Sequence, residues 1–133
     1  MSVEIKGNST SENYITELST RGLNFIVDEP LDKGGKDTAV TPMELIGGAL
    51  SSCTIITLQM YFNHKGWEYD KVEVDVDFDY SSYPVTFKRL VRVTGSFDDN
   101  QKKRIGGIAN ACPVHKLLEK GNTVETTIEV IKI

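Results

Sequence analysis

The hydrophobic pattern of the chain centres on one long apolar stretch, which runs from Thr41 to Lys65 and carries almost no charge after Glu44. Thr41 suits an N-cap, Pro42 suits the first helical position, and Glu44 is placed to complete a capping box. At helical spacing the stretch predicts one apolar stripe, formed by Ile46, Ala49, Leu50, Cys53, Ile56 and Met60. Small residues occupy the opposite side, namely Gly47, Gly48, Ser51 and Ser52. We therefore expect a helix that is buried all round and packs closely against a second backbone.

The residues before this stretch predict three short strands. Val3 and Ile5 alternate with polar neighbours, and the polar run from Gly7 to Asn13 reads as a turn into a second strand at residues 14–18. A third apolar strand is expected at residues 23–27, after a break at Thr20, Arg21 and Gly22. Residues 28–40 have the composition of a loop that leads directly into the helix.

After the helix, which Gly66 is expected to end, residues 72–78 alternate strictly between apolar and acidic side chains. A turn at SSYP leads to a return strand at about residues 85–97, which carries Lys88 and Arg92 on one face. These two cations can lie opposite the acidic row of an antiparallel neighbour. The acidic row is therefore interpreted as a charge-paired sheet face and not as a metal site, since carboxylates that alternate along a strand do not converge on a cation.

The last third predicts a broken helix and a closing strand. Asp98 and Gln101 form a second capping-box pattern, which starts a helix that should end near Ala111 because Pro113 disfavours helical dihedrals at the preceding residue. A short second helix is expected from Pro113 to Gly121, followed by a strand over residues 123–133. The order of elements predicts an α+β fold, with residues 1–133 forming a single domain.

Composition narrows the function classes. The net charge of −4 and the lack of a basic run argue against a nucleic-acid partner. The sequence shows no signal-peptide pattern and, by eye, no apolar run long enough to cross a membrane. Two cysteines in 133 residues do not form a disulfide scaffold, so we expect a cytoplasmic protein with reduced thiols.

Each cysteine has a functional and a structural interpretation. Cys112 is expected at the cap of the helix that starts at Pro113, where unpaired N–H groups favour a thiolate, and His115 is placed to pair with its sulfur. Equally, Cys112 can be a buried kink residue, and Cys53 a small core residue in the central helix. A zinc site built from Cys53, His64, Cys112 and His115 is disfavoured, because no two cysteines are close in sequence. Neither cysteine carries the local signature of a cysteine hydrolase.

Two runs carry a family resemblance. The segment from Asp28 to Thr54, which ends in TPMELIGGALSSCT, is followed by IANACPVHKLLEKG at residues 108–121. Together they resemble the OsmC/Ohr family of osmotically inducible and organic hydroperoxide resistance proteins. The resemblance implies the OsmC-like fold and an intertwined homodimer, in which two central helices pack together and the sites form at the subunit interface.

The same resemblance implies roles for the cysteines. Cys53 would be the peroxidatic thiol that reduces an organic hydroperoxide or acts on another small apolar ligand, and Cys112 would be the resolving thiol that forms a disulfide with it. A dithiol such as a lipoylated protein would then reduce the disulfide. The resemblance thus implies a thiol-dependent peroxidase of oxidative and osmotic stress defence that needs neither metal nor flavin as cofactor.

Some positions depart from the hydroperoxide resistance branch. That branch has a glutamate directly after the proline of the motif, where this chain has Met43, with Glu44 one step later. Its first hairpin supplies a catalytic arginine, and Arg21 is the nearest candidate here. With CPVH at the second cysteine, the sequence fits the less characterised OsmC-like branch better. The alternative functions are a non-enzymatic ligand-binding or redox-sensing module on the same fold, and a protein in which both cysteines only pack.

Overall fold

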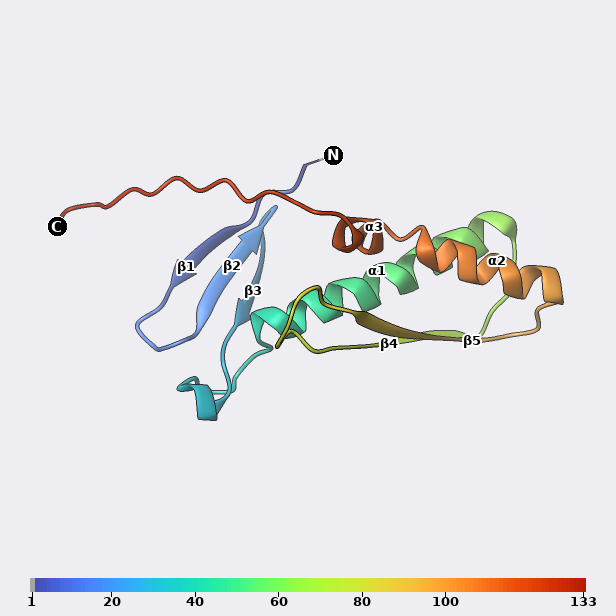
Figure 1. The fold of residues 1–133 in the computed structure, drawn as a ribbon, viewed down its shortest axis with the longest axis horizontal. Helices are drawn as coiled ribbons and strands as arrows, with labels where there is room; N and C mark the ends of the chain where they lie inside the picture. Colours follow the sequence, from blue (N-terminus) through green and yellow to red (C-terminus); the bar gives the residue numbers. More distant parts are fainter. Residues whose placement is uncertain (1) are drawn as a thin grey trace. The chain divides into compact units, whose positions relative to one another are not determined.

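The computed structural model describes residues 2–133 and contains the helices and strands of an α+β protein, as predicted (Figure 1). In chain order the elements are β1 (Lys6–Ser9), β2 (Thr16–Thr20), β3 (Leu23–Val27), the 3-10 helix η1 (Leu31–Lys33), α1 (Pro42–Lys65), β4 (Lys71–Phe78), β5 (Phe87–Thr94), α2 (Asp99–Asn110) and α3 (Pro113–Glu119). They form two compact units. The first unit comprises the residues up to Ala49 together with Val76–Lys88, and the second comprises Leu50–Asp75 and Arg89–Ile133. That residues 1–133 form a single domain stays a prediction.

The first unit contains an antiparallel sheet in the order β1-β2-β3. Arg21 and Gly22 connect β2 to β3 with φ angles of 52° and 81°, as a two-residue hairpin turn with two left-handed residues requires. The third strand lies where the pattern placed it. The first lies later than predicted, because the polar residues Lys6 to Ser9 pair with Ser19 to Thr16, while Val3 and Ile5 precede the strand. Main-chain hydrogen bonds, and not the apolar side chains, set this register.

The long helix α1 begins and ends as predicted. The Thr41 N–H donates to Glu44 Oε1 at 2.8 Å and the Glu44 N–H donates to Thr41 Oγ1 at 3.1 Å, which completes the capping box. Gly66 follows the helix with a φ of 70°, in the left-handed conformation of a helix C-cap.

The buried face of α1 differs from the predicted stripe. Its buried residues are Leu50, Thr54, Leu58 and Phe62, whereas Ile46, Ile56 and Met60 are exposed in the single chain. The prediction was wrong because the helix is apolar on nearly every side, so the period alone could not select a face. By length and mean hydropathy α1 also meets the requirement for crossing a bilayer, contrary to the sequence expectation. Core helices of water-soluble proteins meet the same requirement.

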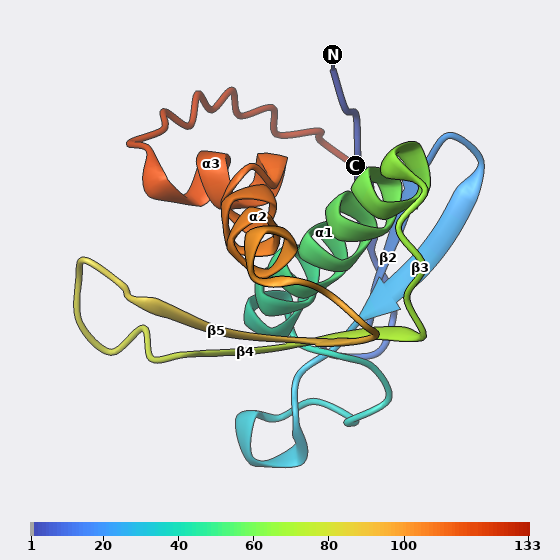
Figure 2. The same ribbon diagram turned by 90° about the vertical axis from the view of Figure 1, so that its right-hand side faces the viewer.

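In the second unit, the C-terminal part of α1 and the helix α2 lie on one side of the strands β4 and β5 (Figure 2). An aromatic cluster fills the space at the end of α1, with Phe62 in ring contact with Trp67, Tyr69 and Phe97. The Ser51 hydroxyl donates to the Val74 carbonyl at 2.7 Å, which brings α1 close to β4. The small residue at this position therefore serves a close helix–strand contact.

The outer faces of β4 and β5 are charge-paired as predicted. Arg92 donates to Asp75 at 2.8 Å and lies 3.6 Å from Glu73, and Lys71 lies 3.2 Å from Glu73. All of these side chains are substantially exposed, so their pairing contributes little to stability. The acidic row is a solvated sheet face.

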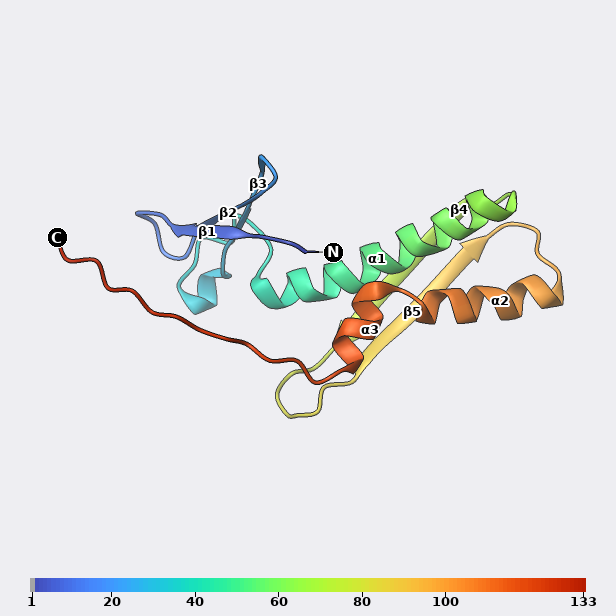
Figure 3. The same ribbon diagram turned by 90° about the horizontal axis from the view of Figure 1, so that it is seen from above.

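The last third of the chain confirms the broken helix and contradicts the closing strand. Asp98 and Gln101 form both hydrogen bonds of a capping box at the start of α2, and α3 begins at Pro113 with Cys112 as its N-cap. Figure 3 shows α2 and α3 as two separate helices. Residues 121–133 form no strand, and Val124, Ile128 and Val130 are at least 80% exposed. An alternating pattern becomes a strand only where a sheet edge accepts its backbone, and this segment has no pairing partner within the described chain.

Candidate functional site

The second unit brings the two cysteines together. Cys53 directly follows Ser52 on α1 and is half-buried, while Cys112 lies between α2 and α3 and is fully buried. Both are free thiols, and they lie close enough for each to shift the pKa of the other. This approach depends on the break between α2 and α3, which Pro113 enforces and which places Cys112 beside α1.

The two sulfurs differ in their electrostatics. Burial raises the pKa of Cys53, and the hydrogen bond that it donates to Cys112 raises the pKa further. Burial also raises the pKa of Cys112, but the thiol of Cys53 and the N–H of His115 outweigh burial, so that its pKa is lowered. The sulfur closes no tight cap hydrogen bond with α3, yet it lies near enough to the first N–H groups to be stabilised as a thiolate. Cys112 is thus the more acidic thiol.

Arg89 is a residue of this site that the sequence analysis missed. It projects from β5 and donates to Thr54 Oγ1 at 3.1 Å, to Asn110 Oδ1 at 3.0 Å, and bonds to His115 Nδ1 at 2.9 Å. Thr54 follows Cys53 in the sequence and is fully buried. A signal was present, because Arg89 has the same strand parity as the inward residues Val91 and Val93, where a charged side chain needs a partner.

The sequence predicted that His115 pairs with the sulfur of Cys112, but the ring of His115 has other partners. It lies between Arg89 and Glu119, with Nε2 at 3.0 Å from the Glu119 carboxylate. Because the guanidinium can only donate, Nδ1 accepts its hydrogen bond and the ring carries its proton on Nε2, toward Glu119. The part of His115 that acts on Cys112 is its backbone N–H, which lowers the pKa of the thiol.

A groove of about 540 Å³ borders this site, between β5 and α2. Arg89 and Asn110 belong to its lining, together with Val91, Val93, Phe97, Ile105 and Ala109. Most of the lining side chains are therefore apolar, and Arg89, Lys102 and Asn110 are the polar ones.

The other predicted site residues lie elsewhere. Glu44 is occupied by the capping box at the start of α1, and Arg21 is an exposed residue of the β2–β3 turn. Both belong to the first unit, and a catalytic role for either stays a prediction. His64 is exposed near the end of α1. Across residues 2–133, no three histidine, cysteine, aspartate or glutamate side chains are grouped as metal ligands would be.

A buried carboxylate, Asp28, is the charged centre of the first unit. It accepts hydrogen bonds from the N–H groups of Tyr14, Glu29, Lys36 and Thr38 and from the Thr38 hydroxyl, the last at 2.8 Å. Burial by itself would raise its pKa, but the hydrogen bonds outweigh burial and lower the pKa from 3.8 to about 2.

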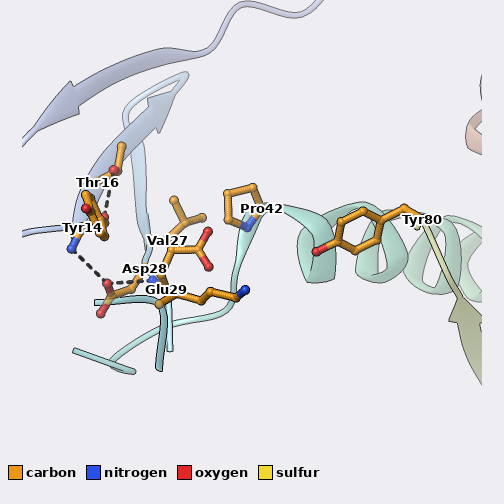
Figure 4. Close-up of a pocket in the computed structure, with 8 residues that line it drawn as sticks. Tyr14, Thr16, Val27, Asp28, Glu29, Pro42 and Tyr80 are labelled. Atoms are coloured by element: carbon orange, nitrogen blue, oxygen red, sulfur yellow. Dashed lines mark hydrogen bonds between the residues drawn. The ribbon is translucent and has the colours of Figure 1, made fainter. Parts of the chain in front are cut away.

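An open pocket of about 520 Å³ adjoins Asp28, and Figure 4 shows its carboxylate turned toward the amide groups of Tyr14 and Glu29. With its oxygens engaged by the backbone, Asp28 is not free to bind a ligand in this pocket. Its role is to hold the loop that leads into α1. The close approach of Gly35 to the Glu29 carbonyl, where a Cβ would clash, belongs to the same compact loop.

The fold and the paired thiols define an α+β protein with a dithiol site. Residues 34–127 match the model of the family described as OsmC-like protein, and the chain belongs to that family. No curated protein matches the chain.

Solved structures share the fold. The OsmC-like protein of Mycoplasma pneumoniae is 12% identical with a TM-score of 0.74, covering 90% of this chain and 88% of its own. An organic hydroperoxide resistance protein from Elizabethkingia anophelis is 15% identical with a TM-score of 0.65, covering 88% and 87%. The organic hydroperoxide resistance protein OhrB of Bacillus subtilis is 18% identical with a TM-score of 0.56, covering 88% and 90%.

Proposed function

We propose that this protein is a thiol-dependent peroxidase that reduces organic hydroperoxides in oxidative stress defence, with Cys53 as the peroxidatic and Cys112 as the resolving thiol. The observation that carries the proposal is the proximity of the two thiols, each of which shifts the pKa of the other, since a peroxidatic and a resolving thiol must meet to form a disulfide. Structural neighbours named as organic hydroperoxide resistance proteins support the same class of reaction.

The unequal thiols suggest how Cys53 is activated. Cys112, whose pKa is lowered, loses its proton more readily than Cys53 and can then take the proton of the neighbouring Cys53 thiol. The Cys53 thiolate then attacks the terminal oxygen of the hydroperoxide ROOH, which breaks the O–O bond, gives Cys53 sulfenic acid and releases RO⁻, which is protonated to the alcohol. Exposure favours this order, because Cys53 is half-buried and Cys112 is fully buried.

Resolution follows at the same contact. The Cys112 sulfur attacks the sulfur of the sulfenic acid, forms the Cys53–Cys112 disulfide, and releases the hydroxyl oxygen as water. A dithiol reductant such as a lipoylated protein then returns both cysteines to thiols by two thiol–disulfide exchanges and leaves as a cyclic disulfide. No metal or flavin takes part in these steps.

The surroundings of the dithiol fit an apolar substrate. The groove between β5 and α2 is lined mostly by apolar side chains, with Arg89 and Asn110 among its polar lining residues. A hydroperoxide with a hydrocarbon body can bury that body there, with its polar end toward the guanidinium. Hydrogen peroxide has no such body, so we expect it to react more slowly.

We also propose that the working form is an intertwined cytoplasmic homodimer. In the single chain Ile56 and Met60 of α1 are 49% and 67% exposed, on a helix that carries no charge between Glu44 and His64. A second copy that covers this face would remove a large apolar surface from water. Two reduced thiols are typical of the cytoplasm. Sedimentation equilibrium of the protein would give the mass of a dimer.

The test of the peroxidase is intact mass with peptide mapping. The reduced protein is exposed briefly to one equivalent of an organic hydroperoxide or of hydrogen peroxide. We expect loss of two hydrogens and a Cys53–Cys112 linked peptide, faster with the organic hydroperoxide. In the Cys112→Ser variant the sulfenic acid of Cys53 should persist and react with dimedone. Thiols that remain unoxidised in the wild-type protein would overturn the peroxidase.

A redox-sensing module is the second candidate, and the raised pKa of Cys53 favours it, because a protonated thiol reacts slowly with peroxide. A sensor would form the same disulfide once but would not turn over. Sustained hydroperoxide consumption with a dithiol reductant distinguishes the enzyme from the sensor.

A further inference from the structure

Arg89 connects the two segments that carry the cysteines. From β5 its guanidinium reaches Thr54, which adjoins Cys53 on α1, Asn110 at the end of α2, and His115 in the first turn of α3. Asn110 and His115 flank Cys112 on its two sides. These partners lie 21 to 35 residues from Arg89 in the sequence, so a single side chain spans three helices.

The partners of Arg89 are themselves held in place by burial or by further hydrogen bonds. Thr54 is fully buried, with its hydroxyl donating to the Leu50 carbonyl at 2.7 Å, so its oxygen offers the guanidinium a fixed acceptor. His115 is fixed in turn by Glu119 at 3.0 Å. A planar guanidinium can serve all of its partners at once because its N–H groups form a rigid fork, whereas an ammonium on a flexible stem cannot.

We propose that Arg89 is a positioning residue that holds the Cys112 segment against α1 and thereby sets how readily the Cys53–Cys112 disulfide closes. The inference deepens the proposed function and rests on it for its role in turnover. Disulfide geometry tolerates little displacement, since the two Cα atoms must lie within about 7 Å with the Cβ atoms turned toward each other. A Cys112 segment released from α1 spends less time in that geometry.

Loss of positioning has a chemical consequence. A sulfenic acid that is not resolved can react with a second hydroperoxide, in which its sulfur gains an oxygen as sulfinic acid while ROOH becomes the alcohol ROH. Slower disulfide closure therefore diverts Cys53 toward the sulfinic acid. A merely structural role of Arg89 would not change this partition in folded protein.

The first test uses a glutathione redox buffer and no peroxide. The protein dithiol and oxidised glutathione are equilibrated with the protein disulfide and two reduced glutathione molecules, and the fractions are read by acid quench and mass spectrometry. We expect the equilibrium constant for disulfide formation to fall about tenfold, or ~30 mV, in Arg89→Met. Arg92→Met is the matched control, because Arg92 lies on the same strand but pairs only with the exposed Glu73 and Asp75. It should stay within about twofold of wild type.

The direction in which the equilibrium constant for disulfide formation changes distinguishes a positioning role of Arg89 from a purely electrostatic one. If Arg89 acted only by stabilising a thiolate, its removal would destabilise the reduced form and raise the equilibrium constant. Arg89→Lys keeps the charge but cannot hold all of the partners, so positioning predicts a fall at least as large as in Arg89→Met. A wild-type constant in Arg89→Lys, or a rise in Arg89→Met, would overturn the proposal.

A second variant tests the proposal even if Arg89→Met does not fold. Asn110→Ala removes one partner of the guanidinium at an exposed position, and we expect about a threefold fall in the same constant. Thermal unfolding checks that each variant is folded. If Arg89→Met does not fold, an unchanged constant in Asn110→Ala overturns the proposal.

The second test measures the partition with organic hydroperoxide. Wild-type protein and Arg92→Met should give the disulfide, and Arg89→Met should give more sulfinic acid at Cys53. Failure of the wild-type protein to react with hydroperoxide would reject the peroxidase but leave the glutathione result standing. An unchanged partition with an unchanged glutathione constant would reject the positioning role.

Discussion

A buried carboxylate and a half-buried guanidinium organise the two units of this protein in different ways. The Asp28 carboxylate in the first unit accepts hydrogen bonds from residues no more than 14 positions away, and most of the donors are backbone N–H groups. The Arg89 guanidinium in the second unit forms hydrogen bonds with side chains from three helices. Asp28 shapes a loop, whereas Arg89 brings separate elements together beside two thiols.

The hydrogen-bond partners of a charged side chain indicate whether it serves the fold or the site. A charge whose hydrogen bonds come mostly from its own loop is sufficiently explained by the fold of that loop. A charge that joins distant elements next to reactive groups controls their relative position. We therefore expect changes at Asp28 to act on stability and changes around Arg89 to act on the chemistry of the thiols.

The largest effect is expected on the rate of hydroperoxide consumption, when one of the two thiols is replaced. Cys53→Ser removes the attacking sulfur, so hydroperoxide consumption with a dithiol reductant should fall at least about 100-fold, with little change in the thermal midpoint. A coupled consumption assay measures the rate. Cys53→Ser with wild-type activity would place the attacking thiol elsewhere.

A smaller effect is expected at Thr54, the buried contact between Arg89 and α1. Thr54→Val keeps the shape but removes the oxygen that accepts from Arg89, so disulfide closure after a peroxide pulse should slow about threefold. The free energy of unfolding should fall by about 1 to 2 kcal/mol, because one guanidinium N–H loses its acceptor. Quenched-flow mass spectrometry and urea unfolding measure the two quantities. Arg92→Met is the control, because Arg92 pairs with Glu73 and Asp75 on the outer sheet face.

Asp28→Asn should lower the stability of the protein and leave the chemistry of the thiols unchanged. The amide places an NH₂ group against backbone N–H donors, so the thermal midpoint should fall by about 5 °C or more. The rate of disulfide closure below the midpoint should stay within about twofold of wild type. A selective loss of thiol chemistry in folded Asp28→Asn protein would break the comparison between the two units.

The smallest predicted effect is confined to acid. The pKa of Asp28 is lowered from 3.8 to about 2, so the folded protein binds fewer protons than the unfolded chain between these values. The contribution of Asp28 to stability is therefore present above about pH 4 and is lost as the pH falls toward 2. Urea midpoints measured from pH 5 to pH 2.5 should fall less steeply in Asp28→Asn than in wild type.

Much of the architecture could be predicted because it depends on neighbouring residues. The capping residues Thr41 and Glu44, the stop at Gly66 and the break at Pro113 each act through hydrogen bonds or dihedral limits within one turn. The buried face of α1 and the C-terminal strand could not be predicted in this way. Both depend on which surface a distant element covers, and an apolar helix or an alternating segment carries no local information about that surface.

The sequence by itself determined the α+β order, the family resemblance and the two candidate thiols, because each is written in short motifs. Only the tertiary structure decided that Cys53 and Cys112 meet, that Cys112 has the lower pKa, and that Arg89 lies beside them. The physical reason is that pKa values and sulfur contacts depend on groups brought together across the chain. Arg89 reads in the sequence as one cation of a strand, and only its partners on three helices give it a place in the site.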